Sequence, residues 1–104
     1  MSRLATHVWI GAIRRLAESE GGTATVIVRG DRDAGDLLLL TRDFAGNEVL
    51  YRPEPWGAGW QLAAAGEEIA AQVTRARSRD RDLWILELAV ANPERFIVSL
   101  PARD

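Results

Sequence analysis

The stretch TATVIVRGDRDAGDLLLLT, residues 23–41, decides the fold because it holds two strand patterns separated by one turn pattern. Residues 23–29 alternate with period two and are rich in β-branched side chains, which predicts a strand. Residues 37–41 form a continuous apolar run that is too short for a free-standing helix and is typical of a central strand buried on both faces. Between them, residues 31–35 are rich in Gly and Asp and predict a five-residue hairpin loop. The expected unit is a β-hairpin whose second strand lies in the middle of the sheet.

The rest of the chain predicts two helices and further strands. Apolar residues recur at three- and four-residue spacing over residues 6–20, which predicts an amphipathic helix. Thr6 is placed to cap the start of this helix, and Gly21-Gly22 to end it. The other expected elements are strands over 48–52 and 61–64, a helix over 66–79, and strands over 83–90 and 95–100, with a loose tail after residue 100.

The element order α-β-β-β-(β)-α-β-β is typical of an α+β domain. We expect a mainly antiparallel sheet of about five to six strands, with the two helices on one face of it. The chain has 104 residues, which is enough to bury one core without disulfides or a metal. Residues 1–104 are therefore predicted to form a single domain.

Composition excludes several classes of function. The chain has no cysteine, so disulfide frameworks, thiolate metal sites and cysteine nucleophiles are excluded, and we expect no cofactor. No segment has the apolar run of a signal peptide or a membrane span, so we expect a soluble cytoplasmic protein with no membrane partner. The formal net charge of −2 argues against a polyanionic partner. All thirteen basic residues are arginines, which a GC-rich coding bias explains.

The segment RGDRDAGD, residues 29–36, holds three carboxylates, two guanidiniums and two glycines. It fails as a calcium loop because Asp36 stands where glycine is required and Arg42 where a bidentate glutamate is required. It fails as a phosphate cradle because a strand, not a helix, is expected to follow it. The adhesion interpretation of Arg-Gly-Asp requires a secreted protein. We therefore predict a hairpin loop in which aspartates accept hydrogen bonds from turn amides and Gly35 adopts a positive φ.

A small enzymatic or metal-dependent site in the same segment stays open as an alternative. Its candidate members are Arg29, Asp31, Asp33 and Asp36, joined by Arg15 or His7 if folding brings them close. His7 is the only histidine, so any histidine-dependent acid–base chemistry must use it. It lies in the first turn of the predicted helix without a carboxylate at helical spacing, which favours a structural role.

Two further clusters are candidates for binding. Trp56 and Trp60 flank a glycine-rich loop and could present two rings to a ligand, or they could fold back onto the core. Residues 74–81 carry four arginines, but helical spacing divides these between two sides, and neighbouring aspartates offset them. A solvated helix end that complements the helix dipole is therefore favoured over a nucleic-acid contact.

Three motifs carry a resemblance to a known family. They are Thr6-His7-x-Trp9 with Ile13-Arg14-Arg15, then Val28-Arg29-Gly30-Asp31-x-Asp33-Ala34-Gly35, and Arg77 ahead of Asp82-Leu83-Trp84. Together they resemble a family of short alphaproteobacterial proteins, the domain-of-unknown-function family 1491. The resemblance extends over residues 3–97 except the loop at 44–60, and the second motif is its most specific part. It implies a small cytoplasmic bacterial protein and no mechanism, and the positions that match the motifs include His7, Trp9, Arg15, Arg29, Asp31, Asp33 and Trp84.

The sequence favours a non-enzymatic binding or protein-interaction domain that uses an exposed sheet edge, the Trp56/Trp60 loop or the Arg and Asp clusters. The first alternative is an RNA-binding domain, because the partial order α-β-β-β-α is similar to that of double-stranded RNA-binding domains. Against it, Gly66-Glu67-Glu68 at the start of the second predicted helix would repel an RNA backbone. The second alternative is the small enzyme or metal-dependent site around Arg29–Asp36. A protein partner is possible, a nucleic-acid partner is not expected, and the oligomeric state is open.

Overall fold

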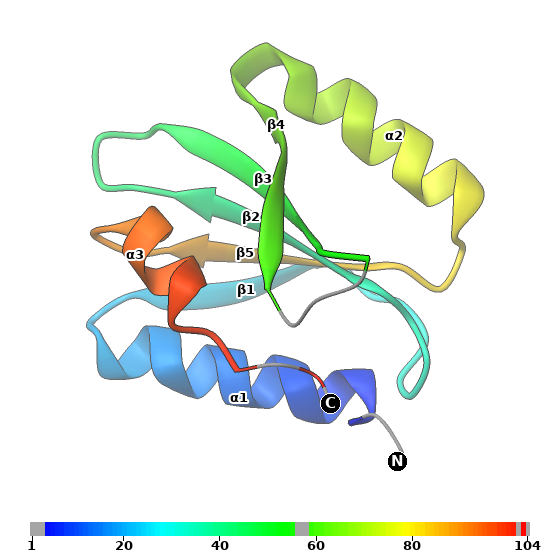
Figure 1. Ribbon diagram of the computed structural model, residues 1–104, viewed down its shortest axis with the longest axis horizontal. Coiled ribbons are helices and arrows are strands. Elements are labelled where there is room, and N and C mark those ends of the chain that lie inside the picture. The colour runs from blue at the N-terminus through cyan, green and yellow to red at the C-terminus, as the bar shows by residue number, and fades with distance from the viewer. Residues whose placement is uncertain (1–3, 56–58, 102, 104) are drawn as a thin grey trace.

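The computed structural model describes residues 4–55, 59–101 and 103, and it shows a five-stranded sheet between helices (Figure 1). In chain order the elements are α1 (Thr6–Ser19), β1 (Thr23–Val28), β2 (Leu37–Arg42), β3 (Glu48–Pro53), β4 (Trp60–Ala65), the 3₁₀ turn η1 (Gly66–Glu68), α2 (Ile69–Arg79), β5 (Trp84–Ala89) and α3 (Pro93–Val98). The α+β class and the mainly antiparallel sheet are confirmed. Both predicted helices and the first five predicted strands are present.

The strand order β1-β5-β2-β3-β4 differs from the expected hairpin. β5 lies between β1 and β2, antiparallel to the first and parallel to the second, with Leu86 opposite both Val26 and Leu39. β5 is therefore hydrogen-bonded to a neighbouring strand along each of its two edges. Residues 29–36, called the crossover segment from here on, therefore pass over the end of β5, and the prediction of a β1–β2 hairpin is wrong. The central position predicted for β2 is confirmed.

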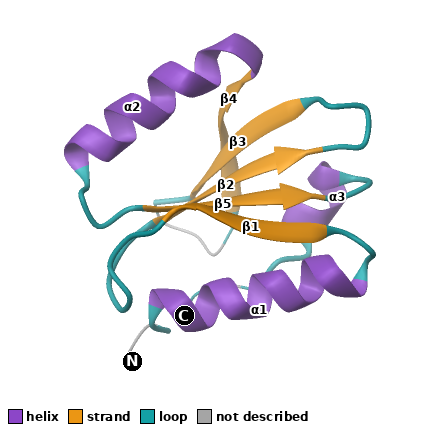
Figure 2. Ribbon diagram, turned by 180° about the vertical axis from the view of Figure 1, so that it is seen from behind, coloured by secondary structure: helices purple, strands orange, loops and turns teal. Residues whose placement is uncertain are grey.

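The helices α1 and α2 cover opposite faces of the sheet (Figures 1 and 2). Successive side chains of a strand point to opposite faces. In β2, Leu37 and Leu39 enter the core that contains Ile13 of α1, whereas Leu38 enters the core against which Val73 of α2 packs. The prediction that both helices share one face is therefore wrong, because a strand that is apolar on both sides needs a cover on each side.

The segment expected to be a strand over 95–100 is instead the helix α3. The Asn92 side chain accepts a hydrogen bond from the backbone N–H of Arg95 and caps the helix, and Pro93 occupies its start. Phe96 and Ile97 then pack into the core on the α1 side of the sheet. The apolar run after Pro93 was compatible with either element, and the Asn-Pro cap decides for a helix.

The two ends of α1 are formed in different ways. The cap residue at its start is Ala5, with no side-chain cap, so the predicted cap by Thr6 is wrong. At the other end Gly21 adopts a φ of 79°, and the N–H of Gly22 donates to the carbonyl of Ala17 at 2.9 Å, which ends the helix as predicted.

Within the residues described, no helix has the length and apolar character needed to cross a membrane.

Candidate functional site

The crossover segment is fixed on β5 by backbone and side-chain hydrogen bonds. The N–H of Asp31 donates to the carbonyl of Asp82 at 3.0 Å, and the indole N–H of Trp84 donates to the carbonyl of Asp31. The Asp31 carboxylate accepts from the N–H groups of Asp33 at 2.9 Å and Ala34 at 2.8 Å. These bonds confirm the predicted aspartate-stabilised turn at Asp31. The two amides, that of Ala34 first, hold the pKa of Asp31 below its usual value.

Two glycines allow the crossover segment to approach β5 closely. A Cβ atom on Gly30 or on Gly35 would collide with the carbonyl oxygen of Asp82. Gly35 does not have a positive φ, so the prediction that it supplies a left-handed turn residue is wrong. It is required because no side chain fits between the two backbones at this point.

The crossover segment also receives the first turn of α1. The N–H of Thr6 donates to the carbonyl of Asp33 at 3.2 Å, and the N–H of His7 donates to the carbonyl of Arg32 at 3.0 Å. Two of the amides that a helix start leaves without an internal partner are thereby satisfied. The buried hydroxyl of Thr6 donates to the carbonyl of Gly35 at 2.6 Å. The crossover segment thus takes the place of a side-chain cap.

Arg103 closes this cluster from the C-terminal side. It is only 7% exposed, and its guanidinium donates to the Thr6 hydroxyl at 2.7 Å, the Asp33 carbonyl at 3.1 Å and the Leu4 carbonyl at 2.9 Å. It also lies 5.4 Å from the centre of the Trp9 ring. The prediction of a loose tail is therefore wrong at Arg103. An arginine near the end of a sequence carries no local signal of burial, since its partners lie far away along the chain.

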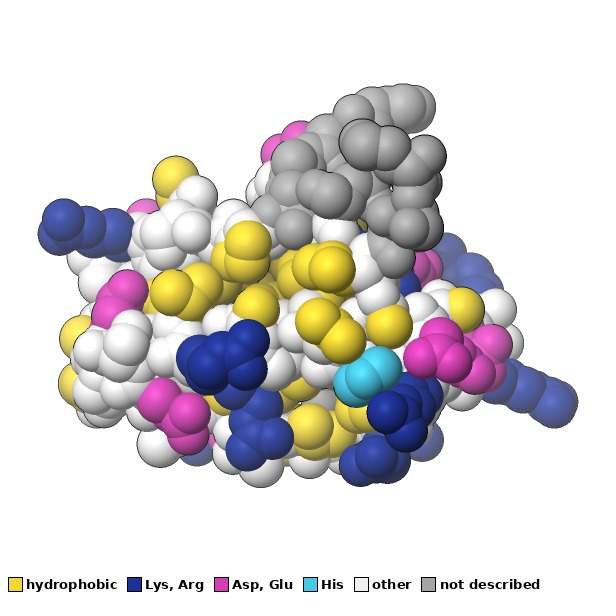
Figure 3. All heavy atoms as spheres, turned by 90° about the horizontal axis from the view of Figure 1, so that it is seen from below, with side chains coloured by type: hydrophobic (Ala, Val, Ile, Leu, Met, Phe, Trp, Pro, Cys, Tyr) yellow, Lys and Arg dark blue, Asp and Glu magenta, His cyan; other side chains and the backbone are white. Residues whose placement is uncertain are grey.

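The predicted candidates of this region are brought together only in part. The Asp33 carboxylate lies 3.9 Å from Nδ1 of His7, but its side chain is 76% exposed. The same Nδ1 lies 3.1 Å from the carbonyl of Arg32. Figure 3 shows the histidine in cyan at the surface of the face that carries α1, between acidic and basic side chains. The guanidinium of Arg29 lies 5.4 Å from the centre of the Trp84 ring.

Arg15 and Asp36 lie apart from the other candidates. Arg15 is exposed on α1, and its guanidinium lies over Gly11 of the same helix. Asp36 is exposed at the end of the crossover segment and lines a groove of about 420 Å³ together with Arg52 and Arg79. Across the described ranges, no three acidic or histidine side chains are placed to hold a metal ion.

The two tryptophans predicted as a binding pair have different outcomes. Trp56 lies outside the described residues. Trp60 begins β4 and stacks on Trp9 of α1, with ring centres 5.3 Å apart and ring planes at 23°. Its indole N–H is buried and has no hydrogen-bond partner in the part of the chain that the structure describes. The Trp60 ring therefore packs against the core, which is the second of the two arrangements expected for it.

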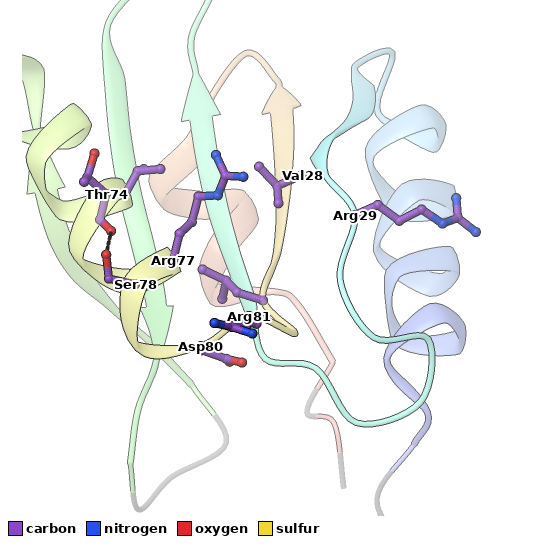
Figure 4. Close-up of a pocket in the computed structure, with 9 residues that line it drawn as sticks. Val28, Arg29, Thr74, Arg77, Ser78, Asp80 and Arg81 are labelled. Atoms are coloured by element: carbon purple, nitrogen blue, oxygen red, sulfur yellow. Dashed lines mark hydrogen bonds between the residues drawn. The ribbon is translucent and has the colours of Figure 1, made fainter.

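An open groove of about 460 Å³, the α2 groove, lies beside the C-terminal half of α2 (Figure 4). Its apolar floor consists of Val28, Val73 and Leu83, and its polar lining consists of Arg29, Thr74, Arg77, Ser78, Asp80 and Arg81. In Figure 4 the side chain of Arg77 extends toward Val28 across the groove, whereas that of Arg29 points away toward α1. The groove therefore combines an apolar surface with arginine side chains from α2 and the turn that follows it.

In the part of the chain that the structure describes, Arg77 and Arg81 of the α2 groove form no ion pair with the aspartate beside them. Within the residues described, neither Arg77 nor Arg81 has a hydrogen bond or an ion pair. Asp80 supplies the carboxylate of the lining, and that carboxylate accepts from the N–H of Asp82 at 2.9 Å. The helical spacing in the sequence places Arg77 and Arg81 on one side. The sequence does not predict that the end of β1 lies beside these two arginines, because that arrangement depends on how the sheet and α2 pack.

Three solved structures are similar to this chain over nearly its whole length. A crystal structure of a DUF1491 family protein from Caulobacter crescentus has a TM-score of 0.81 and 28% identity, covering 96% of this chain and 98% of that chain. An NMR structure of a DUF1491 family protein from the same species has a TM-score of 0.78 and 28% identity, covering 100% of both chains. A solution structure of a protein from A. tumefaciens has a TM-score of 0.77 and 30% identity, covering 92% of this chain and 93% of that chain.

Family membership follows from the sequence itself. A search of curated proteins finds no match. The family model described as "Protein of unknown function (DUF1491)" matches residues 4–98, a range that includes the crossover segment and the α2 groove. The resemblance of the three motifs is therefore confirmed, and the chain belongs to the DUF1491 family.

Proposed function

We propose that this protein is a small non-enzymatic binding domain and that its α2 groove holds an acidic segment of a partner protein. The observation that carries the proposal is the pair Arg77 and Arg81, which lie without acidic partners beside an apolar floor. A guanidinium binds a carboxylate through two parallel hydrogen bonds, and the floor offers apolar contact area. A partner segment that combines carboxylates with aliphatic side chains fits both features.

A binding role is supported by what the other charged candidates do. The Asp31 carboxylate accepts from turn amides, the Arg29 guanidinium lies over Trp84, and Nδ1 of His7 faces a backbone carbonyl. Each of these groups contributes to the packing of the crossover segment. The absence of cysteine suits a reducing compartment, so we place the protein and its partner in the cytoplasm.

The distribution of charge supports a protein partner over RNA. The chain has a net charge of −2, and Glu67 and Glu68 lie directly before α2. The arginines of α2 are divided, since Arg77 lines the α2 groove and Arg79 lines the neighbouring groove with Asp36. An RNA backbone is bound by a continuous row of cations. A short acidic peptide needs only the two neighbouring guanidiniums of Arg77 and Arg81.

Fluorescence anisotropy with a labelled peptide library tests this proposal. Peptides in which Asp or Glu alternates with Leu should bind, whereas the same peptides with Asn or Gln should not. In the variant Arg77→Ala/Arg81→Ala the affinity for the acidic peptides should fall about tenfold, because two partly exposed charge pairs together contribute about 1.4 kcal/mol. Absence of binding to every acidic peptide would refute the proposal.

A matched variant controls for overall charge. Arg14→Ala/Arg95→Ala removes the same charge from exposed positions on α1 and α3, outside the α2 groove, and should bind as the wild type does. An equal loss in both variants would show a diffuse charge effect and contradict a groove site. A gel shift with duplex RNA at low salt, absent in the groove variant and unaccompanied by peptide binding, would overturn the protein partner in favour of RNA.

A further inference from the structure

The strand β1 forms one edge of the sheet, and among the described residues it has a neighbouring strand on one side only. It pairs with β5, and the order β1-β5-β2-β3-β4 places it last. Figure 2 also shows that no helix or other strand of the described chain passes in front of β1 on the side from which it is viewed. An edge strand leaves backbone N–H and C=O groups available to another strand. The outer side of β1 is therefore an open position for one more strand.

The sequence of β1 contains none of the residues that usually protect an edge. Its six residues, TATVIV, include no charged residue, no proline and no glycine. Natural edge strands are commonly protected by charged side chains, above all lysine, or by proline. Thr25 is exposed, and Ile27 is 51% exposed although it is apolar. The register with β5 is regular over residues 23–26, so most of the strand is extended and suited to pairing on its outer side as well.

The two ends of β1 carry opposite charges. Glu20 precedes the strand, Arg29 follows it directly, and both side chains are exposed. Neither forms an ion pair with another described residue, and the Arg29 guanidinium lies over the Trp84 ring. When two identical strands pair antiparallel about a two-fold axis, the start of each lies beside the end of the other. Glu20 of each copy then comes near Arg29 of the other copy, which gives two opposite-charge contacts.

The opposite edge of the sheet, β4, lacks this complementarity. Its six residues are uncharged as well, but acidic residues lie at both of its ends. The N–H of Glu54 donates to the carbonyl of Gly59 at 3.0 Å, which places Glu54 beside the start of the strand. Glu67 and Glu68 follow its end. Two antiparallel copies of β4 would therefore bring carboxylates together at both ends, and like charges repel. Charge complementarity thus favours β1 as the edge that pairs with itself.

We propose that this protein forms a two-fold symmetric dimer in which β1 of one copy pairs antiparallel with β1 of a second copy. The two five-stranded sheets then join into one continuous sheet. Thr25 lies at the axis, directly opposite Thr25 of the second copy, and such cross-strand threonine pairs are favourable. Because the shared edge is only six residues long, the interface is small, and the dimer is of the weak, concentration-dependent class.

Sedimentation velocity on the whole chain tests for this dimer. The wild type should be monomeric at about 10 µM and largely dimeric near about 1 mM, because interfaces of this size are weak. Thr25→Lys places two ammonium groups opposite each other at the axis and should remain monomeric over this range. Thr25 is exposed, so the variant should keep the wild-type amide spectrum. A wild type that stays monomeric throughout, or a folded Thr25→Lys variant that dimerises equally well, would overturn the proposal.

Reversed charges test the antiparallel arrangement of the two strands. Glu20→Arg and Arg29→Glu each produce two like-charge contacts in a dimer of one variant, and each should weaken that dimer about tenfold. An equal mixture of the two variants restores both opposite-charge contacts, so it should dimerise about as well as the wild type. Arg75→Glu, which reverses an exposed charge on α2, is the matched control and should leave the dimer unchanged. A mixture that dimerises no better than its components would contradict the contact between the strand ends.

A single cysteine tests the position of the axis. The chain has no cysteine, so Thr25→Cys introduces its only thiol. Directly opposite residues of an antiparallel pair have Cβ atoms about 4.5–5.5 Å apart, so a short bis-maleimide should link two copies efficiently. Leu62→Cys, at an exposed position of β4, is the control and should be linked only at the rate of random encounters. Equal linking at the two positions would overturn the assignment to β1.

The outcome of these experiments is separate from that of the α2 groove. The dimer requires neither an acidic peptide nor the guanidiniums of Arg77 and Arg81, so either proposal can fail while the other stands. If β1 instead accepts a strand from a different protein, the purified chain remains monomeric near about 1 mM. That result would overturn the second copy as the occupant of this edge.

Discussion

Replacing Thr6 by valine tests whether the crossover segment holds α1 in place. Thr6→Val preserves the shape of a fully buried side chain and removes its hydroxyl. That hydroxyl donates to the carbonyl of Gly35 at 2.6 Å and accepts from the guanidinium of Arg103 at 2.7 Å. Because both bonds are buried, water does not replace either of them.

The expected loss follows from these two bonds. A neutral hydrogen bond contributes about 1 kcal/mol, and one to a charged group about 1.5–3 kcal/mol. The Gly35 carbonyl keeps a longer bond of 3.4 Å from Arg103, which lessens the first loss. The free energy of unfolding should therefore fall by about 2–3 kcal/mol. For a domain of this size the melting temperature should fall by about 10 °C or more.

Urea unfolding followed by tryptophan fluorescence measures the difference in the free energy of unfolding between Thr6→Val and the wild type, and the m value should be the same for both. Thr25→Val, at an exposed position of β1, is the matched control and should change stability by less than about 0.5 kcal/mol. If Thr6→Val loses no more than this control, the role assigned to the Thr6 hydroxyl is wrong. In a cycle with Arg103→Met, the double variant should lose less than the sum of the single losses, since the two residues share a bond.

Further substitutions test other parts of the fold. Gly35→Ala should lower the free energy of unfolding by about 3 kcal/mol, because the new Cβ would collide with the Asp82 carbonyl. A decrease of less than about 1 kcal/mol in urea unfolding would contradict this close approach. Phe96→Ala should lower the free energy of unfolding by about 3–5 kcal/mol, because the Phe96 side chain is only 2% exposed. Val98→Ala should lower it by less than about 0.5 kcal/mol, because Val98 is 86% exposed. A strand would place both side chains on one face, so equal losses on thermal unfolding would exclude the helix α3. Tyr51, the single tyrosine, should ionise above the pKa of about 10 that is usual for tyrosine. Its contribution to stability is complete below that value and is lost as the pH rises through the folded pKa, and ionisation at or below pH 10 in a spectrophotometric titration would contradict its burial.

The secondary structure follows from local patterns, whereas its arrangement does not. Side-chain periodicity reports burial at each position, so the alternation in β1 and the leucine run in β2 predict strands. Pairing depends on which strand fills the space between them, and β5 enters that space from a distant part of the sequence. The leucine run even implied that both faces of the sheet are covered, which already required helices on opposite sides. At α3 the cap at Asn92 was a usable local signal for a helix.

The candidate site divides in the same way between local and distant contacts. The turn at Asp31 could be predicted because its donors, Asp33 and Ala34, lie within three residues. The bond between Thr6 and Arg103 joins residues 97 positions apart, and no local pattern predicts it. The α2 groove likewise combines elements that meet only after folding.

The insertion of β5 between β1 and β2 sets the order in which the sheet closes as the chain is synthesised. β1 and the β2–β3–β4 meander emerge before the strand that joins them. Until β5 follows, TATVIV and LLLLTR each present an edge that lacks its final neighbour. Both are rich in β-branched or leucine side chains, which favours pairing with other chains. A ribosome that stalls before Trp84 therefore leaves two aggregation-prone edges uncovered, and completion of β5 removes both at once.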